Sequence, residues 1–217
     1  MYINLLEQYI ETGNYHDLEL LLQKEPSILS EKTSHHISPL LLACYYNKPN
    51  IIKTILKYTN TITLHEACAA GLNKHVQMML EHKPEVINEF STNGFTALGI
   101  ASHFNHTDIV RLLLLHRADP NIASQNNFHI YPLHTSLINN HSEISKLLIE
   151  AGSEINILQK DNITPLHLAA QVGNIDMIIV LLEQGADITI KCKNGLTPAD
   201  FANKKGFKEI AEILKSN

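Results

Sequence analysis

The chain has 217 residues, 44% of them hydrophobic and 18% charged, which is enough to bury a core in one large domain or two small ones. Its formal net charge is -5 and its lysines are scattered, so it lacks the basic stripe that nucleic acid binding requires. No apolar run approaches membrane-spanning length and the first residues do not form a cationic and then apolar leader, so we expect neither a membrane span nor a cleaved signal.

The three cysteines, Cys44, Cys68 and Cys192, are an odd number, and two of them fall inside apolar helical patterns. This usage favours buried thiols in a reducing compartment over a disulfide framework. We therefore expect a cytoplasmic protein.

The first expected element, residues 2–23, is a helical segment with an apolar and a polar side. The apolar side chains are Leu5, Leu6, Tyr9 and Ile10, and the polar ones are Glu7, Gln8 and Glu11. This pattern is typical of a polar-faced cap at one end of a stack of helices.

From residue 38 onward, six stretches repeat one signature of a proline or its substitute followed by an apolar residue. They are Ser38-Pro39-Leu40, Ile62-Thr63-Leu64-His65, Thr96-Ala97-Leu98, Tyr131-Pro132-Leu133-His134, Thr164-Pro165-Leu166-His167 and Thr197-Pro198-Ala199. A Gly or Asn recurs just before a second apolar helix, at Gly13, Asn47, Gly71, Asn105, Asn140, Gly173 and Gly206. We call these seven equivalent positions the Gly or Asn column. Successive differences along this column are 34, 24, 34, 35, 33 and 33 residues. The chain is therefore built from a repeat of about 33 residues.

The unit that begins at Thr164 explains these residue choices. Thr164 can cap a helix with its hydroxyl group, and Pro165 suits the first turn, where an N–H group has no intrahelical partner. Gly173 ends this short helix because glycine tolerates positive φ, and Gly185 ends a second, more apolar helix. Neither helix is long enough to be stable alone, so the pair must stack against neighbouring pairs to bury its apolar flanks.

A period near 33 that carries T-P-L-H resembles the ankyrin repeat family over nearly the whole chain. The resemblance implies an all-α solenoid of helix-turn-helix units with short β-turn or hairpin fingers, forming one domain over residues 1–217. We expect seven units: an N-terminal cap over about 1–34, units starting near 35, 60, 91, 126 and 159, and a C-terminal cap over about 192–217. The last unit departs from the motif and alternates charged and apolar residues in its final helix, so we expect no unpaired end that calls for another domain.

Unit lengths vary along the chain. The interval from Asn47 to Gly71 is short, and the loss lies between Leu56 and Leu64, so one finger should be missing or stunted. The intervals around Pro84-Glu85 and around Asn126-Asn127-Phe128 are one or two residues longer than 33, which is consistent with enlarged fingers. Two interpretations stay open: neutral drift of surface loops, or a notch shaped for a partner.

Thirteen histidines invite metal or catalytic hypotheses. The family resemblance implies that His65, His134 and His167 form hydrogen bonds within and between repeats. The pairs His35/His36 and His103/His106 lack Cys or acidic partners for a metal site. All nine glycines are isolated, so neither a phosphate cradle nor a nucleophile elbow is present. We expect no catalytic residues, metal or cofactor.

The resemblance implies that partners bind on the concave side, formed by finger tips and the outward positions of the first helices. The candidate protein-binding residues are Tyr45, Tyr46, Thr92, Asn93, Phe95, His103, Phe104, Asn127, Phe128, Ile130, Ile138 and Asn139. Five of them are aromatic, as expected of binding hot spots, although Phe104 or Tyr46 folding inward over a neighbouring repeat is the alternative. The C-terminal end of this surface is modestly basic because it carries Lys160, Lys193, Lys204 and Lys205. We interpret these lysines as solvated surface charges rather than as functional residues.

The preferred function is a monomeric protein-protein interaction module, such as an adaptor or inhibitor, that binds another protein or peptide but no nucleic acid or membrane. Two alternatives remain. The first is a microbial effector delivered into a host cell, where it binds a host protein. The second is an enzyme with an unrecognised site, against which a shallow groove argues because it does not exclude water.

Overall fold

The structure is a computed structural model that describes residues 2–215. Within these residues the chain is helical, with no extended sheet. The α-helices are α1 (Tyr2–Thr12), α2 (Tyr15–Lys24), α3 (Pro39–Tyr45), α4 (Pro49–Tyr58), α5 (Leu64–Ala69), α6 (Asn73–His82), α7 (Ala97–His103), α8 (Thr107–Leu115), α9 (Pro132–Ile138), α10 (Ser142–Glu150), α11 (Pro165–Val172), α12 (Ile175–Glu183), α13 (Pro198–Lys205) and α14 (Lys208–Ile213). Three short 3-10 helices are η1 (Pro26–Ser30), η2 (Pro84–Asn88) and η3 (Lys160–Asn162). The all-α repeat fold expected from the sequence is confirmed.

The chain divides into two compact units, the first ending at Glu81 and the second beginning at His82. In the first unit, α1 pairs with α2 and α3 pairs with α4, while α1 also packs on α3 and α2 on α4. Leu6 and Ile10 from α1 and Leu18 and Leu22 from α2 are fully buried in this packing. Each helix therefore buries an apolar face that it could not shield alone.

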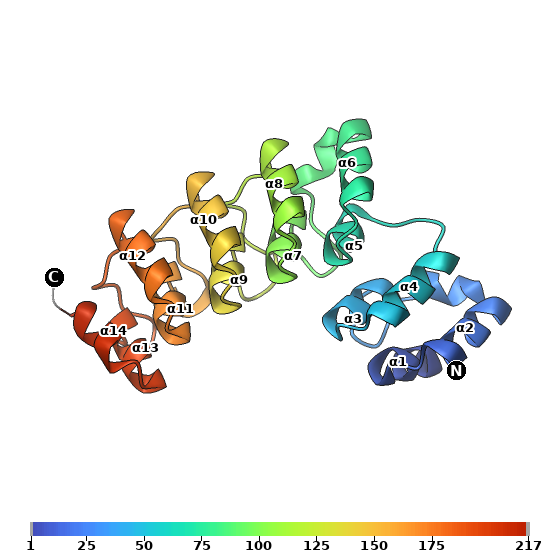
Figure 1. Ribbon diagram of the computed structural model, residues 1–217, viewed down its shortest axis with the longest axis horizontal. Helices are drawn as coiled ribbons and strands as arrows, with labels where there is room; N and C mark the ends of the chain where they lie inside the picture. Colours follow the sequence, from blue (N-terminus) through green and yellow to red (C-terminus); the bar gives the residue numbers. More distant parts are fainter. Residues whose placement is uncertain (1, 216–217) are drawn as a thin grey trace. The chain divides into compact units, whose positions relative to one another are not determined.

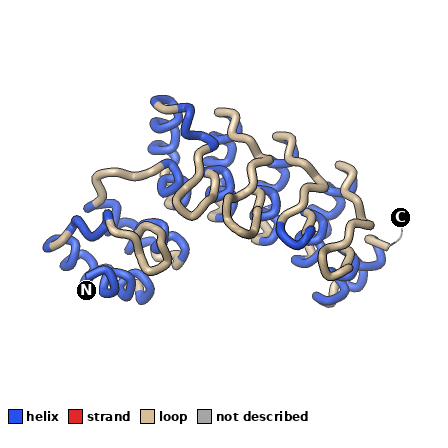
Figure 2. The backbone as a smooth tube through the Cα atoms, turned by 180° about the vertical axis from the view of Figure 1, so that it is seen from behind, coloured by secondary structure: helices blue, strands red, loops and turns tan. Residues whose placement is uncertain are grey.

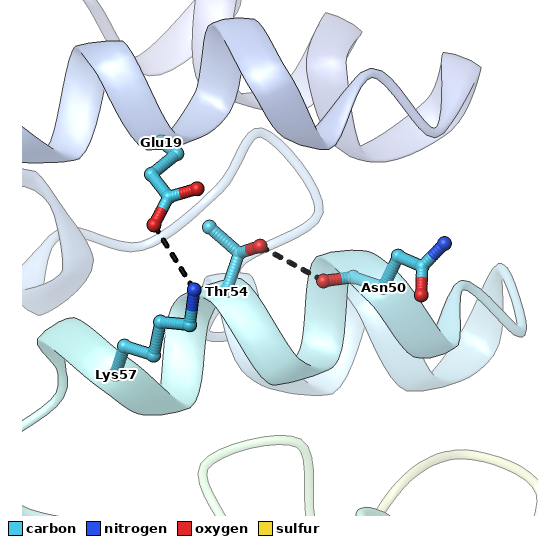
Figure 3. Close-up of polar contacts among 4 residues, drawn as sticks. All are labelled: Glu19, Asn50, Thr54 and Lys57. Carbon is cyan, nitrogen blue, oxygen red and sulfur yellow. Dashed lines mark hydrogen bonds and ion pairs between the residues drawn. The ribbon is translucent and has the colours of Figure 1, made fainter.

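Polar contacts also join α2 and α4 (Figure 3). Lys57 Nζ lies 3.0 Å from Glu19 Oε1, and the hydroxyl of Thr54 donates to the carbonyl oxygen of Asn50, 2.9 Å away within α4. Because the Lys57 side chain is 61% exposed, this ion pair contributes little stability compared with the apolar contacts.

In the second unit, consecutive helix pairs lie side by side in chain order (Figure 1). The first helices α7, α9, α11 and α13 contact one another in succession, and the second helices α8, α10 and α12 do the same. Leu133 of α9 is 1% exposed and Leu166 of α11 is fully buried. The core is thus a continuous layer between neighbouring pairs, as repeat proteins require.

Helix starts and ends follow the residues that recur in the sequence. Ser38, Thr63, Thr96, Thr164 and Thr197 each accept a hydrogen bond from a backbone N–H group of the helix that follows. All seven residues of the Gly or Asn column have positive φ, between 50° and 88°. The column is therefore a set of left-handed turns, for which Gly and Asn carry the smallest steric cost.

In the second unit the loops between helix pairs form four fingers, residues 90–96, 123–131, 158–164 and 191–197 (Figure 2). Isolated β-bridges join Phe90 to Thr96 and Gln159 to Ile163. Backbone hydrogen bonds connect successive fingers: Gln125 to Gly94 (2.7 Å), Lys160 to Phe128 (3.0 Å) and Lys193 to Asp161 (2.8 Å). We call the exposed side chains of these four fingers the finger surface.

An asparagine in the outer turn ties consecutive repeats together. The Asn121 side chain donates to the carbonyl oxygen of Gly152 at 3.0 Å and accepts from the backbone N–H of Glu154 at 2.9 Å. Asn156 repeats this arrangement one repeat later. Both sides of the amide are used, so the spacing between pairs is fixed at the turns as well as at the fingers.

The length variations are partly as expected. Only residues 59–63 connect α4 to α5, whereas residues 83–96 connect α6 to α7, so the missing finger is confirmed. The finger around Asn127 is enlarged, because its closing hydrogen bond joins Ser124 to Ile130 whereas the preceding finger closes between Ser91 and Phe95. The expectation of an enlarged finger at Pro84-Glu85 is wrong: these residues begin η2, ahead of the finger.

Two other expectations can be compared with the structure. All three cysteines are buried and free, as the sequence predicted. Among the described residues, no helix combines the length and apolarity needed to span a bilayer.

Candidate protein-binding surface

Tyr45 and Tyr46 lie at the end of α3 in the first unit. Their side chains are 42% and 39% exposed, and the Tyr46 hydroxyl donates to Glu11 Oε1 at 3.0 Å. This hydrogen bond is the main cause of a raised pKa for the Tyr46 phenol. Tyr46 does not fold inward, so the alternative of a buried ring does not apply to it.

The first finger of the second unit carries Thr92, Asn93 and Phe95. Thr92 is exposed, whereas Asn93 and Phe95 are half-buried. The Asn93 side chain accepts a hydrogen bond from the Ser91 hydroxyl, which also accepts from the backbone N–H of Phe95. Asn93 therefore shapes the finger, and Thr92 is the residue that this tip exposes.

The second finger presents the most exposed predicted aromatic ring. Phe128 is 55% exposed, and Lys160 from the next finger lies over it with Nζ 4.8 Å from the ring centroid. Asn127 beside it is exposed and Ile130 is half-buried. A cation over an aromatic face is attracted by the ring quadrupole, so the two fingers are held together by this contact as well as by their backbones.

An open hollow of about 200 Å³ lies between these two fingers. It is lined by Phe128, Ile130, Gln159, Lys160, Asp161 and Ile163. Ile130 and Ile163 are half-buried, while Lys160 and Asp161 are exposed. The hollow thus combines an apolar lining with charged groups at its edge, the usual composition of a small binding pocket.

The ends of α7 and α9 bring four further predicted residues together. The ring of Phe104 is half-buried and lies edge-on to His103 at 4.8 Å between centroids. Asn139 Nδ2 is 3.4 Å from His103 Nδ1, and Ile138 is 39% exposed. Burial is the first cause, ahead of the charge of His141, of a lowered pKa at His103. Phe104 is therefore partly covered, and Ile138 provides more of the exposed apolar area here.

Two histidines of the repeat motif are buried and structural. His134 Nε2 lies 3.0 Å from the carbonyl oxygen of Ile163, and His167 Nε2 lies 3.1 Å from that of Leu196, each in the next finger. The expected hydrogen bonds between repeats are confirmed at these two positions. Burial lowers the pKa of both, to about 4 for His134, so these rings are neutral at physiological pH.

The described residues contain no group of three or more His, Cys, Asp or Glu side chains that could hold a metal ion. Burial raises the pKa of the Cys44 thiol to about 12 and also raises that of Cys68. A reactive cysteine needs a lowered thiol pKa, so neither thiol is suited to act as a nucleophile.

The most exposed large apolar residue among the described residues and one feature of this surface were not predicted from the sequence. Leu115, the last residue of α8, is 79% exposed, and a signal was available because α10 and α12 end in Glu150 and Glu183 at the same position. The hollow had no such signal, since two fingers form it together and the repeat motif does not cover their tips.

Comparison with known proteins agrees with this geometry. A family model described as ankyrin repeats in three copies matches residues 59–124, 117–192 and 133–217. Stacked helix pairs with fingers define the class, and the chain belongs to the ankyrin repeat family.

Several curated proteins are similar to the chain. An ankyrin repeat protein of Acanthamoeba polyphaga mimivirus is 29% identical over 68% of this chain and 21% of its own length. Alpha-latrocrustotoxin-Lt1a of Latrodectus tredecimguttatus is 29% identical over 67% of this chain and 8% of its own. The human transient receptor potential cation channel subfamily A member 1 is 28% identical over 58% and 12%. The chain thus spans about a fifth or less of the length of these relatives.

Proposed function

We propose that the chain is a protein-protein interaction module that binds a partner protein or peptide on its concave side, through the finger surface and the adjoining ends of α7 and α9. Proteins built from such repeats generally act by binding other proteins on extended surfaces. The observation that carries the proposal is Phe128, a ring 55% exposed beside a hollow on fingers that hydrogen bonds tie together. An aromatic anchor on a pre-organised surface binds with little ordering cost.

We further propose that the protein is non-catalytic and monomeric and that it acts in a reducing compartment. Its three free, buried cysteines favour such a compartment. The alternative raised by the sequence is delivery into a host cell by a microbe, and such an effector would bind its partner through the same surface. This alternative stays a prediction that a secretion-reporter fusion can test.

The test compares two aspartate substitutions in the second unit. Phe128→Asp places a charge in the finger surface, while Leu115→Asp places one at an apolar position on α8 that is more exposed, 79% against 55%. We expect both variants to melt within a few degrees of the parent chain, because both side chains are largely exposed. We expect partner proteins captured from a lysate to be lost with Phe128→Asp and retained with Leu115→Asp. Capture that survives Phe128→Asp, or that is lost equally in both variants, would contradict the proposal.

A further inference from the structure

Positive charge gathers on the two fingers that follow Phe128. Lys160, Lys191 and Lys193 are all exposed there, and the only carboxylate exposed on the same two fingers is Asp161. Asp161 Oδ1 lies 3.7 Å from Lys193 Nζ, and both side chains are at least half exposed. Two lysine charges therefore remain uncompensated within a chain whose net charge is -5.

The acidic residues of the second unit lie elsewhere. Those on its second helices are Asp108, Glu143, Glu150, Asp176, Glu183, Glu209 and Glu212. On the first helices, Asp200 accepts hydrogen bonds from the backbone and hydroxyl of Thr197 at the start of α13. The same second helices also carry Arg111, Lys146 and Lys208, so their seven acidic and three basic residues leave a net charge of -4, whereas the two fingers carry three lysines and one aspartate. The finger side therefore attracts anionic groups more strongly than the second helices do.

The hollow beside these lysines has the dimensions of one apolar group. Its volume is about 200 Å³, and an apolar cavity of about 150 Å³ can hold a benzene molecule. The Phe128 ring, Ile130 and Ile163 supply an apolar lining, and Lys160 Nζ stands over the ring at the rim. Lys160 and Asp161 line the hollow and Lys193 Nζ lies 3.7 Å from Asp161, so an apolar side chain in the hollow would place its flanking residues near Lys160 and Lys193, with Lys191 two residues before Lys193 on the same finger.

We propose that this hollow and its three lysines bind an extended peptide segment in which one apolar side chain is flanked by Asp or Glu. The apolar side chain fills the hollow, and the flanking carboxylates pair with Lys160, Lys191 and Lys193. The inference rests on the proposed interaction function and adds the chemistry of the partner.

A nucleic acid is the competing anionic ligand, and the structure favours the peptide. Three lysines on two fingers offer few phosphate contacts, and neither of the chain's arginines, Arg111 on α8 and Arg117 just beyond it, lies on a finger. Nucleic acid binding depends on neutralising many phosphates along a basic stripe, which a chain of net charge -5 does not present.

The experiment selects peptides from a random display library on the full chain. Selected peptides are then measured by fluorescence anisotropy against Lys160→Glu/Lys193→Glu, against the matched reversal Lys146→Glu/Lys208→Glu on α10 and α14, and against Phe128→Asp. Both double variants change the net charge equally and alter exposed lysines. Circular dichroism confirms that each variant is folded. A single-stranded deoxythymidine 20-mer serves as the nucleic acid probe.

We expect the selected peptides to share acidic residues beside one apolar residue. Lys160→Glu/Lys193→Glu should weaken the binding of these peptides about tenfold at low salt and less at high salt. The affinity of Lys146→Glu/Lys208→Glu for the same peptides should stay within about twofold of that of the parent chain. Peptides that need Phe128 but are neutral or basic would overturn this inference and leave the proposed function standing. Selection of no Phe128-dependent peptide, or lysine-dependent binding of the 20-mer, would also overturn it. The proposed function fails separately, when lysate capture survives Phe128→Asp.

Discussion

At the scale of single residues, His134 and His167 show how one substitution changes a repeated hydrogen-bond pattern. His167 Nδ1 lies 2.7 Å from the Thr164 hydroxyl and accepts from the Thr164 backbone, so both ring nitrogens have partners. In the preceding repeat Tyr131 replaces the threonine and makes no side-chain cap, and His134 Nδ1 has no hydrogen-bond partner. His134 is therefore the buried group most sensitive to protonation, because burial opposes its charged form.

The first prediction concerns stability at acidic pH. The pKa of His134 is about 4 when folded against an ordinary value of 6.5, so between these values the unfolded chain binds the proton more readily. Stability should be unaffected by this group above pH 6.5 and should fall as pH drops through that window, by roughly 3 kcal/mol in full. Urea unfolding at about pH 7 and about pH 4.5 measures the loss. His134→Gln should be less stable than the parent chain at pH 7. Between the two pH values, its free energy of unfolding should fall by about 2 kcal/mol less than that of the parent chain. Equal losses in both proteins would assign the acid sensitivity to other groups.

At the scale of helices, the contact between successive pairs depends on glycine as well as on apolar area. A Cβ atom added to Gly173 would lie 2.5 Å from Phe207 Cζ, a contact that must displace the ring. A Cβ atom added to Gly206 would meet no atom within 4 Å. Both glycines have positive φ, 75° and 88°, so they share the backbone requirement and differ only in the ring contact.

The second prediction uses this difference. Gly206→Ala should lower the free energy of unfolding by about 1 kcal/mol, from backbone strain alone. Gly173→Ala should cost about 1 to 3 kcal/mol more, since Phe207 must leave its place against α11. Urea unfolding of both variants, and of Gly173→Ala/Phe207→Ala, forms the test. If removing the ring fails to relieve the extra cost of Gly173→Ala, the ring contact is not its cause.

Helix starts and ends were predictable because they depend on local chemistry. A capping hydroxyl, a first-turn proline and a left-handed Gly or Asn act within a few residues, so Thr164, Pro165 and Gly173 could be assigned from the sequence. Loop length was less informative, since an extra residue near Pro84 does not reveal whether it enters a finger or a 3-10 helix. The exposure of Phe104 and the position of Lys160 over Phe128 depend on neighbouring repeats and could not be predicted.

At the scale of the molecule, the stability of each unit is the sum of interfaces between neighbouring pairs. In the second unit α9 packs between α7 and α11, and its Leu133 is 1% exposed. In the first unit α2 packs against α1 and α4, and its Leu18 is fully buried. Because the main contacts of these helices are with neighbouring helices, damage at one place should spread through nearby pairs before it reaches distant ones.

The third prediction follows from the division at Glu81 and His82. Leu133→Ala should destabilise by about 2 to 5 kcal/mol and should accelerate amide exchange in α7, α9 and α11 while leaving α1 to α4 near the parent rate. Leu18→Ala, the matched substitution in the first unit, should give the reverse pattern. Hydrogen exchange read by mass spectrometry locates both effects along the chain. A single cooperative domain over residues 1–217, as the sequence predicted, would instead accelerate exchange throughout in both variants. The two outcomes differ most in α1 and α2, because these helices belong to the first unit and Leu133 to the second.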